Sequence, residues 1–387
     1  MEDKMKNCLD LSGNYGGIYR LAEELKIQER AIIDFSAPSN PLGVSKKIKA
    51  ELRRHLKYLH NYPDPEAKRL KKRLSQHYGI APETILCGNG STEIIYLLAR
   101  SLKPRKVIIP VPAFSGYERA CHISCNSEVI HYRLKAENNF DMDPHEFVKT
   151  VEENLPVAEK QNSHLRSPGF PPFPCCDMVF LCNPNNPTGR LLKRDGIKTI
   201  ADSASKLGYY LVVDESFIDF CPDDSVIWDV AENPYLIVLR SMSSFYALAG
   251  LRFGYGIISR QLAEGLKEYK EPWTVNSLAQ RAAVVALKDK VFRKETIATV
   301  QEERRYLEKN FGKMGMELVP SETNFFLATM DHVADILLKL RKKGILLREC
   351  DHFQGLDSTH IRIAVKSHRE NAILVKELKR ILQNCNK

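Results

Sequence analysis

The chain has 387 residues, 43% hydrophobic and 27% charged, which suits a globular protein of two packed domains and leaves no apolar run near the ~20 residues that span a bilayer. Its net charge is +9, but no basic tract is interleaved with aromatic residues, so we expect small anions as ligands and neither nucleic acid nor a membrane as partner. The ten cysteines lack metal-site spacing and the first residues lack a secretory signal, so we expect no metal and a cytoplasmic location.

Residues 61–270 alternate short apolar runs with helical patterns, one of which ends at Gly208. This alternation predicts an α/β fold: a large domain whose mostly parallel sheet is flanked by helices. Ligands of such sheets bind at the carboxyl ends of the strands. The runs that we interpret as buried strands are 106–111, 178–183, 209–216, 235–241 and 253–259.

Residues 271–387 have a different pattern, which predicts a smaller α+β domain at the C-terminal end. The turn-rich residues 1–60 are expected to form an N-terminal arm and to complete this domain. The proline-rich stretch 155–176 is interpreted as a surface insertion of open role. The elements expected in the small domain are amphipathic helices at 331–344 and 367–382 and a strand at 360–366 between them.

A glycine-rich stretch, GNGSTE at 88–93, follows an apolar run and precedes a helical pattern. Its glycines allow a tight turn, Ser91 can cap the helix, and the first N–H groups of a helix attract anions. Gly90, Ser91 and Thr92 are therefore candidates for a phosphate cradle, although an ordinary capped turn explains this stretch when it is taken alone.

Two other strand ends carry polar side chains. The turn CNPNNPTGR offers amide groups beside the expected crevice, Asn186 among them. The strand LVVDES runs straight into Asp214 and Glu215, and a carboxylate at a buried strand end is costly unless it is paired. Its partner is either the protonated ring nitrogen of a cofactor or an ordinary salt bridge.

A fourth stretch, RSMSSFYALAGLRFGYG at 240–256, follows the next strand. Ser241 and Ser243 can donate hydrogen bonds to phosphate oxygens, and Arg252 can pair with a dianion. The glycines of this stretch allow the backbone to approach a ligand closely.

The order and spacing of these pieces resemble the fold-type I pyridoxal-phosphate enzymes, the aspartate aminotransferase superfamily, over nearly the whole chain. The resemblance implies pyridoxal 5'-phosphate as cofactor, with Asp214 at its ring nitrogen and Asn186 at its phenolic oxygen. It also implies a homodimer in which Tyr62 reaches the phosphate group held by the neighbouring subunit. The other residues that it assigns to the cofactor are Gly90, Ser91, Thr92, Phe114, Phe217, Ser241, Ser243 and Arg252.

Within this superfamily the chain looks like the branch that holds histidinol-phosphate aminotransferase and L-threonine-O-3-phosphate decarboxylase. Three stretches resemble the decarboxylase: YGGIYRLAEEL, with Tyr15 where the decarboxylase has His; DFSAPSNPLG; and LLRECDHFQGLDSTHIRIAV. Two arginines in the last stretch suit a substrate with both a carboxylate and a phosphate, because a guanidinium group can hold either one bidentately. The resemblance thus implies substrate binding by Tyr15, Asn40, Asn186, Arg348 and Arg362, and which arginine takes the phosphate stays open.

The implied function is a lyase reaction, the decarboxylation of a phosphorylated amino acid in cobalamin biosynthesis. The substrate is L-threonine O-3-phosphate, giving aminopropanol phosphate, or L-serine O-phosphate, giving ethanolamine phosphate. The cofactor drains electrons from the bond that breaks, and the arginine that orients the substrate carboxylate decides which bond that is. The alternatives are a histidinol-phosphate type of aminotransferase and a non-catalytic homologue that binds pyridoxal phosphate.

The turn at 240–256 lacks the residue that the family uses for covalent attachment of its cofactor. The family pattern is Ser-x-x-Lys, and its register puts the lysine at Ser244, while no lysine occurs anywhere from 207 to 266. Serine cannot form an imine, so we expect an enzyme that is inactive or slow in this form, with Ser244 and Asp214 at the catalytic positions. Three explanations stay open: a variant made to trap a bound ligand, a natural cofactor-binding homologue, and a natural enzyme that uses other groups.

Overall fold

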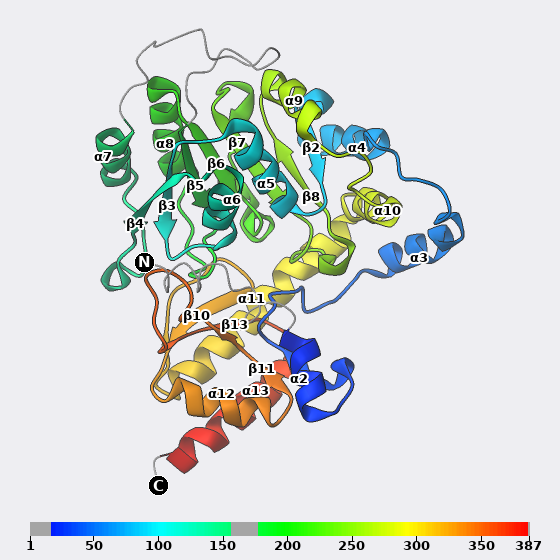
Figure 1. The fold of residues 1–387 in the computed structure, drawn as a ribbon. Helices are drawn as coiled ribbons and strands as arrows, with labels where there is room; N and C mark the ends of the chain where they lie inside the picture. The colour runs from blue at the N-terminus through cyan, green and yellow to red at the C-terminus, as the bar shows by residue number, and fades with distance from the viewer. Residues whose placement is uncertain (1–16, 156–176, 386–387) are drawn as a thin grey trace.

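The computed structural model describes residues 17–155 and 177–385. Figure 1 shows a large part built on a sheet and, below it, a smaller part in which the blue N-terminal helix lies near the red C-terminal one. Tyr15 and nearly all of the proline-rich stretch lie outside the described residues. None of the described helices is long and apolar enough to cross a membrane.

The large part holds a seven-stranded sheet in the order β2-β8-β7-β6-β5-β3-β4. Every neighbouring pair is parallel except the two that involve β8, which confirms the predicted mostly parallel sheet. β8 runs against its neighbours because the chain returns from β7 through a short turn instead of a crossover helix. The strands are β2 (Ile85–Gly88), β3 (Lys106–Val111), β4 (Glu128–Arg133), β5 (Met178–Cys182), β6 (Tyr210–Asp214), β7 (Leu236–Ser241) and β8 (Gly254–Ile257).

Helices cover both faces of this sheet, because successive strand residues point to opposite sides. In β6, Tyr210 and Val212 join the buried cluster under α5 (Ser91–Leu102), α6 (Gly116–Cys125) and α9 (Arg260–Leu266). Leu211 and Val213 join the cluster on the other face. That face is covered by α3 (Lys46–His55), α4 (Lys68–Tyr78), α7 (Pro144–Asn154), α8 (Arg194–Leu207) and α10 (Ser277–Ala286).

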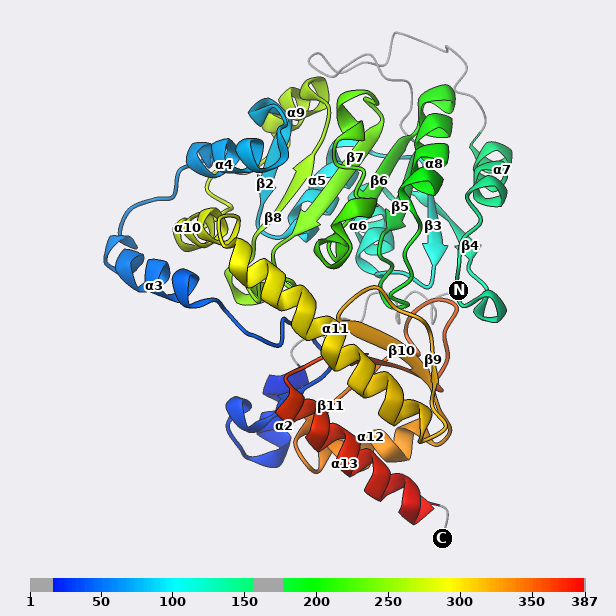
Figure 2. The same cartoon turned by 180° about the vertical axis from the view of Figure 1, so that it is seen from behind.

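The smaller part has an antiparallel sheet of four strands in the order β12-β13-β10-β9 and a parallel pair, β1 with β11. Because β1 comes from the N-terminal arm, both ends of the chain build this part. Figure 2 shows the long helix α11 running from the large part into the small one. The elements are α2 (Gly17–Leu25), β1 (Ile33–Asp34), α11 (Lys290–Gly312), β9 (Glu317–Leu318), β10 (Phe325–Thr329), α12 (Val333–Arg341), β11 (Ile345–Leu346), β12 (Arg348–Glu349), β13 (His360–Ala364) and α13 (His368–Cys385).

The packing of α3 and α10 is relevant to the predicted domain boundaries, which fall between residues 60 and 61 and between residues 270 and 271. Ile48 of α3, the buried side of α10 and Phe292 belong to the same cluster as one face of the seven-stranded sheet. We therefore propose that the large domain includes α3 and extends to about Phe292, with the small domain formed by the rest of the N-terminal arm and the residues that follow.

Candidate active site

Asp214 lies at the carboxyl end of β6 and is 4% exposed. Its Oδ2 accepts a hydrogen bond from the Tyr117 hydroxyl at 2.8 Å, and its Oδ1 accepts from the Ser216 N–H and hydroxyl at 3.0 and 2.5 Å. Burial raises the pKa of Asp214, and the hydrogen bonds from Ser216 and Tyr117 offset this only in part. A buried carboxylate with neutral partners is stabilised by a cationic ligand group, so this site fits a protonated ring nitrogen.

The neighbouring carboxylate, Glu215, has a different environment. Its Oε2 accepts from Arg240 at 2.8 Å and from the Ser225 hydroxyl at 2.7 Å. Arg240 also bonds Asp219, so these groups form a buried charged network. For Glu215 the ordinary salt bridge is therefore the correct interpretation, and only Asp214 is left for a ligand.

The predicted phosphate cradle brings together the start of α5 and Arg252. A Cβ added to Gly90 would lie 2.6 Å from Arg252 Nη2, and one added to Gly254 would lie 2.2 Å from the Ser91 backbone N. The exposed Arg252 guanidinium therefore lies against the helix N-terminus, where the N–H groups and the helix dipole also favour an anion. This arrangement fits a phosphate group.

The expectation that Ser91 caps α5 is wrong. The N-cap residue is Gly90, with φ of 79°, and no side chain caps the helix there. Instead, Glu93 bends back and accepts a hydrogen bond from the Asn89 N–H. Ser91 and Thr92 are thus in the first turn of the helix, at the anion-attracting end.

The other predicted phosphate ligands are Ser241, the last residue of β7, and Ser243 in the turn that follows. The Ser243 N–H donates to the Ser241 hydroxyl at 3.2 Å. Arg252, at the end of the same turn, has φ of 57° and donates from Nη1 to the Ala249 carbonyl at 3.2 Å. The turn therefore returns Arg252 to the start of α5.

Ser244 is half-buried in this turn. Its carbonyl oxygen accepts from the Asn40 N–H at 3.0 Å and from the Ala247 N–H at 3.2 Å. The Asn40 side chain donates to the Phe245 carbonyl at 2.6 Å and to the Thr296 hydroxyl at 2.8 Å. Asn40, predicted as a substrate ligand, thus holds the turn in place, and its role toward a substrate stays a prediction.

Arg362 connects the small domain to the Asn186 turn. Its Nη1 donates to Asn186 Oδ1 at 2.5 Å, its Nη2 donates to the Ser36 carbonyl at 2.7 Å, and it is 7% exposed. Its guanidinium also lies over the Phe325 ring, 5.2 Å from the centroid. The structure thereby brings two predicted ligands, Asn186 and Arg362, into direct contact.

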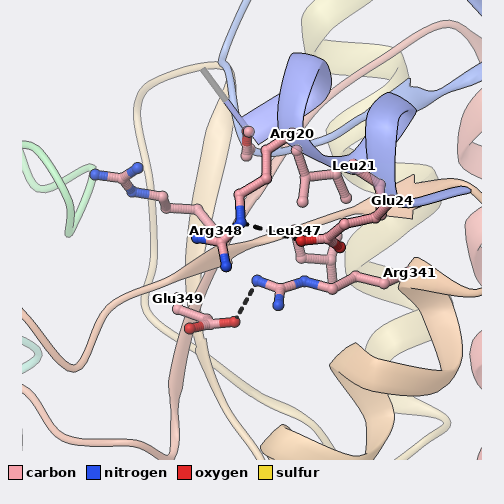
Figure 3. A pocket seen from close by; sticks show the side chains of 10 residues that line it. Arg20, Leu21, Glu24, Arg341, Leu347, Arg348 and Glu349 are labelled. Carbon is pink, nitrogen blue, oxygen red and sulfur yellow. Dashed lines mark hydrogen bonds and ion pairs between the residues drawn. The ribbon is translucent and has the colours of Figure 1, made fainter. Parts of the chain in front are cut away.

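Arg348 is directly opposite Arg362 on the neighbouring strand and also lines a pocket of ≈ 220 Å³ between α2 and the end of α12. Figure 3 shows Arg20 and Glu24 entering this pocket from α2, with Arg341 and Glu349 paired on the opposite side. Arg348 also contacts His352 at 3.2 Å. Burial and the Arg348 charge lower the pKa of His352 to about 4, so this histidine is neutral at pH 7 and leaves Arg348 its full charge.

The predicted aromatic residues occupy three different places. Phe114 is half-buried and meets Tyr117 edge to face at 5.4 Å. Phe217 is buried and packs edge to face against Phe325 at 5.0 Å. Tyr62 is 82% exposed, which leaves it available to another subunit.

Sequence reasoning missed Tyr117, Ser216 and Arg20. Tyr117 stands three residues after Phe114, and Ser216 stands two residues after Asp214. A short Asp-x-Ser spacing at a strand end is a signal for such a local hydrogen bond. Tyr117 carried no comparable signal, because its partner Asp214 is 97 positions away in the sequence. Arg20 pairs locally with Glu24, but its place in the pocket beside Arg341 and Arg348 depends on packing between the two ends of the chain.

Residues 30–378 match the model of the aminotransferase class I and II family, and the chain belongs to that family. It is 33% identical to the threonine-phosphate decarboxylase of Salmonella typhimurium over 375 residues, covering 96% of this chain and 97% of the relative. It is 35% identical over 324 residues to the histidinol-phosphate aminotransferase of a Thermoanaerobacter species, covering 83% and 84%. The solved histidinol-phosphate aminotransferase of Clostridium acetobutylicum is similar with a TM-score of 0.80 at 28% identity, covering 91% and 100%.

The family depends on pyridoxal phosphate, so the prediction of this cofactor is confirmed at the level of the family. The predicted fold is confirmed as well. The relatives include both a decarboxylase and an aminotransferase at similar identity, so they leave the reaction of this chain undecided.

Proposed function

We propose that this chain is a pyridoxal-phosphate-dependent decarboxylase of a phosphorylated amino acid whose activity is impaired by Ser244. The supporting observation is that Arg348 and Arg362 are directly opposite each other on the paired strands β12 and β13, and that Arg362 also contacts Asn186. Two neighbouring guanidinium groups suit a substrate with two anionic groups.

The two arginines have distinct roles in this proposal. Arg362 binds the substrate carboxylate, because its contact with Asn186 puts it beside the cofactor site. Arg348, directly opposite Arg362 across the strand pair, binds the phosphate, while Arg20 and Arg341 are paired with Glu24 and Glu349. The substrate is phosphothreonine or phosphoserine, and the reaction belongs to cobamide synthesis in the cytoplasm.

The cofactor would be held by Asp214 at its ring nitrogen and by Arg252, Ser241, Ser243 and the start of α5 at its phosphate. When bound, it supplies an electron sink for the bond that breaks. Arg362 orients the carboxylate for loss of CO2, a step that needs no base. Ser244 cannot hold the cofactor covalently and cannot speed the exchange of substrate and product amines, so turnover is slow.

A second candidate is a protein that binds the cofactor and a phosphorylated amine without processing them. Ser244 favours this candidate, because every other predicted cofactor contact is retained around it. A third, an aminotransferase acting on histidinol phosphate, is favoured by the 35% identity to such an enzyme. It requires a lysine to move a proton, which Ser244 cannot do.

The experiment that tests the proposal replaces Ser244 by lysine in the full chain. The Ser244→Lys variant is expected to release CO2 from phosphothreonine or phosphoserine at least ~100-fold faster than the unchanged protein. The matched control is Ser244→Arg, which puts a positive charge at the same position but cannot form an imine, and which should stay slow.

The alternatives give different outcomes. Product formation from histidinol phosphate that requires a keto acid would make the chain an aminotransferase. A Ser244→Lys variant that binds the cofactor yet converts none of the three substrates would support the non-catalytic homologue. Failure of either form to bind the cofactor would overturn all three functions.

A further inference from the structure

The segment Ser36–Asn40, which we call the bridging segment, connects the two domains at the site. Three consecutive carbonyl oxygens of this segment accept hydrogen bonds from side chains of the small domain. Those of Ser36, Ala37 and Pro38 accept from Arg362 at 2.7 Å, Lys366 at 2.9 Å and Asn324 at 2.8 Å.

The other end of the bridging segment is bound to the large domain. Asn40 is 4% exposed, its N–H donates to the Ser244 carbonyl, and its side chain donates to the Phe245 carbonyl. A single segment of five residues, with a tight turn in which the Ser39 N–H donates to the Ala37 carbonyl at 2.8 Å, therefore links Arg362 to the turn that carries Ser244. A shift at one end is transmitted to the other through the donors to the Ser36, Ala37 and Pro38 carbonyls and through Asn40.

Lys366 is the unexplained member of this set. It lies four residues after Arg362 and on the same side, since alternate residues along an extended chain share a face. Burial lowers the pKa of its amine, and its hydrogen bond goes to a neutral carbonyl. Burying an ammonium group on such a partner is costly, and the attraction of the Asp34 and Glu370 carboxylates offsets this cost only in part. The contact with Ala37 therefore needs a reason.

The backbone of Lys366 is held on both sides by the buried Asn371, whose side chain accepts from the Lys366 N–H at 3.1 Å and donates to its carbonyl at 2.8 Å. This clamp fixes the direction in which the lysine side chain leaves the strand. The amine is thereby directed at the middle carbonyl of the bridging segment.

We propose that Lys366 is a positioning residue that locks the bridging segment between Arg362 and the Ser244 turn. Removing the amine leaves the Ala37 carbonyl bonded to the Ser39 N–H of the segment itself and takes away its tie to the small domain. The flanking contacts of Ser36 and Asn40 then loosen together. The consequence for ligands rests on the proposed function, in which Arg362 binds the substrate carboxylate.

The test compares Lys366→Met, which keeps the length of the side chain but removes its charge and donors, with Lys106→Met. Lys106 is a matched control, because its amine also donates to a backbone carbonyl, that of Asn154, at 3.2 Å, away from the site. Hydrogen exchange of the Asn40 amide is measured without ligand. We expect it to be about tenfold faster in Lys366→Met and unchanged in Lys106→Met.

A second readout uses cofactor-loaded protein and two ligands, phosphothreonine and aminopropanol phosphate, which is the same amine without its carboxylate. Lys366→Met should bind phosphothreonine about tenfold more weakly and aminopropanol phosphate less than ~twofold more weakly. Lys366→Arg keeps a charged donor, so it should restore most of the slow exchange at Asn40 and most of the affinity for phosphothreonine. It is also the variant to measure if Lys366→Met fails to fold.

Unchanged hydrogen exchange at the Asn40 amide in Lys366→Met would overturn the positioning role. An equal loss of affinity for phosphothreonine and aminopropanol phosphate would overturn it as well. If the unchanged protein binds neither ligand, the proposed function fails. The exchange experiment then still decides whether Lys366 locks the segment, because it needs no ligand.

Discussion

At the scale of single residues, Asp214 and Glu215 show how two adjacent carboxylates acquire different roles. Glu215 is neutralised by Arg240, and its place in the buried network requires no ligand. Asp214 has only a tyrosine and a serine as donors, and burial raises its pKa. The ligand-free protein therefore bears the free energy cost of an uncompensated buried carboxylate at this point.

This cost leads to a prediction for Asp214→Asn. A raised pKa means that the native state holds the proton more tightly than the unfolded chain, so stability falls as pH rises from 3.8 through the native pKa. At pH 7 the full cost is present, and the ligand-free variant should melt about 2 °C above the unchanged protein, with the difference disappearing toward pH 4.

The same variant should bind the cofactor at least ~10-fold more weakly, because the partner of the ring nitrogen is gone. Melting curves at several pH values and a cofactor titration check both effects. Ser216→Ala, which keeps the charge and removes a donor, is the control and should lower the melting temperature at pH 7. Equal melting temperatures of Asp214→Asn and the unchanged protein at pH 7 would contradict this account.

At the scale of elements, the start of α5 depends on glycine. Gly90 has φ of 79°, and a Cβ there would lie 2.6 Å from Arg252, so Gly90→Ala should displace the guanidinium from the helix N-terminus. We expect a loss of cofactor affinity of at least ~10-fold. Gly79→Ala is a matched control: its φ is 70°, it follows α4, and its Cβ would meet nothing within 4 Å.

Gly79→Ala should lose about 1 kcal/mol of stability, because it forces an alanine into the left-handed region. Gly90→Ala should lose more, because φ of 79° and ψ of 162° lie in a region that is essentially restricted to glycine. Only Gly90→Ala should also lose cofactor binding. The measurement is a cofactor titration beside a denaturant melt. An equal loss of cofactor affinity in the two variants would mean that backbone strain, not the approach of Arg252, explains the effect.

Elements were predictable from the sequence wherever a local pattern decided them. The apolar runs gave the central strands, and Gly208 ended α8 as expected. A sequence pattern shows that a helix has a buried face but does not show which element covers it. α10 is amphipathic whichever domain it packs against, so its contacts with α3 and α4 could be found only from the structure. The Asn186–Arg362 contact, between residues 176 positions apart, could not be derived for the same reason.

At the scale of the whole molecule, the site draws on both domains. Arg362 and Lys366 come from the small domain, and Asp214 and the Ser244 turn come from the large one. The two parts are joined by the bridging segment and by α11 (Figure 2), which contact each other through the hydrogen bond from the Asn40 side chain to the Thr296 hydroxyl. Changes in the angle between the domains must therefore alter the distance from Arg362 to the cofactor site.

The predicted homodimer adds a further contributor, because the exposed Tyr62 is expected to reach the neighbouring subunit. Beside Trp273, it lines a groove of ≈ 510 Å³ with Tyr58 and Val284. A dimer would cover Tyr58, Tyr62 and Trp273, whose large side chains are exposed in a single chain. Sedimentation should give a particle of twice the 44.1 kDa chain mass.

Mixing two defective variants tests whether Tyr62 acts across the interface. Tyr62→Ala and Arg252→Ala should each bind the cofactor weakly as pure dimers. The two variants are unfolded and refolded together in equal amounts, so that half of the dimers carry one copy of each variant. In each mixed dimer, one of the two sites combines an intact Arg252 with an intact Tyr62 from the other subunit. High-affinity binding should then return in about a quarter of all sites. If Tyr62 serves the site of its own chain, no site is intact in any mixed dimer, and the titration of the mixture equals the average of the two pure variants.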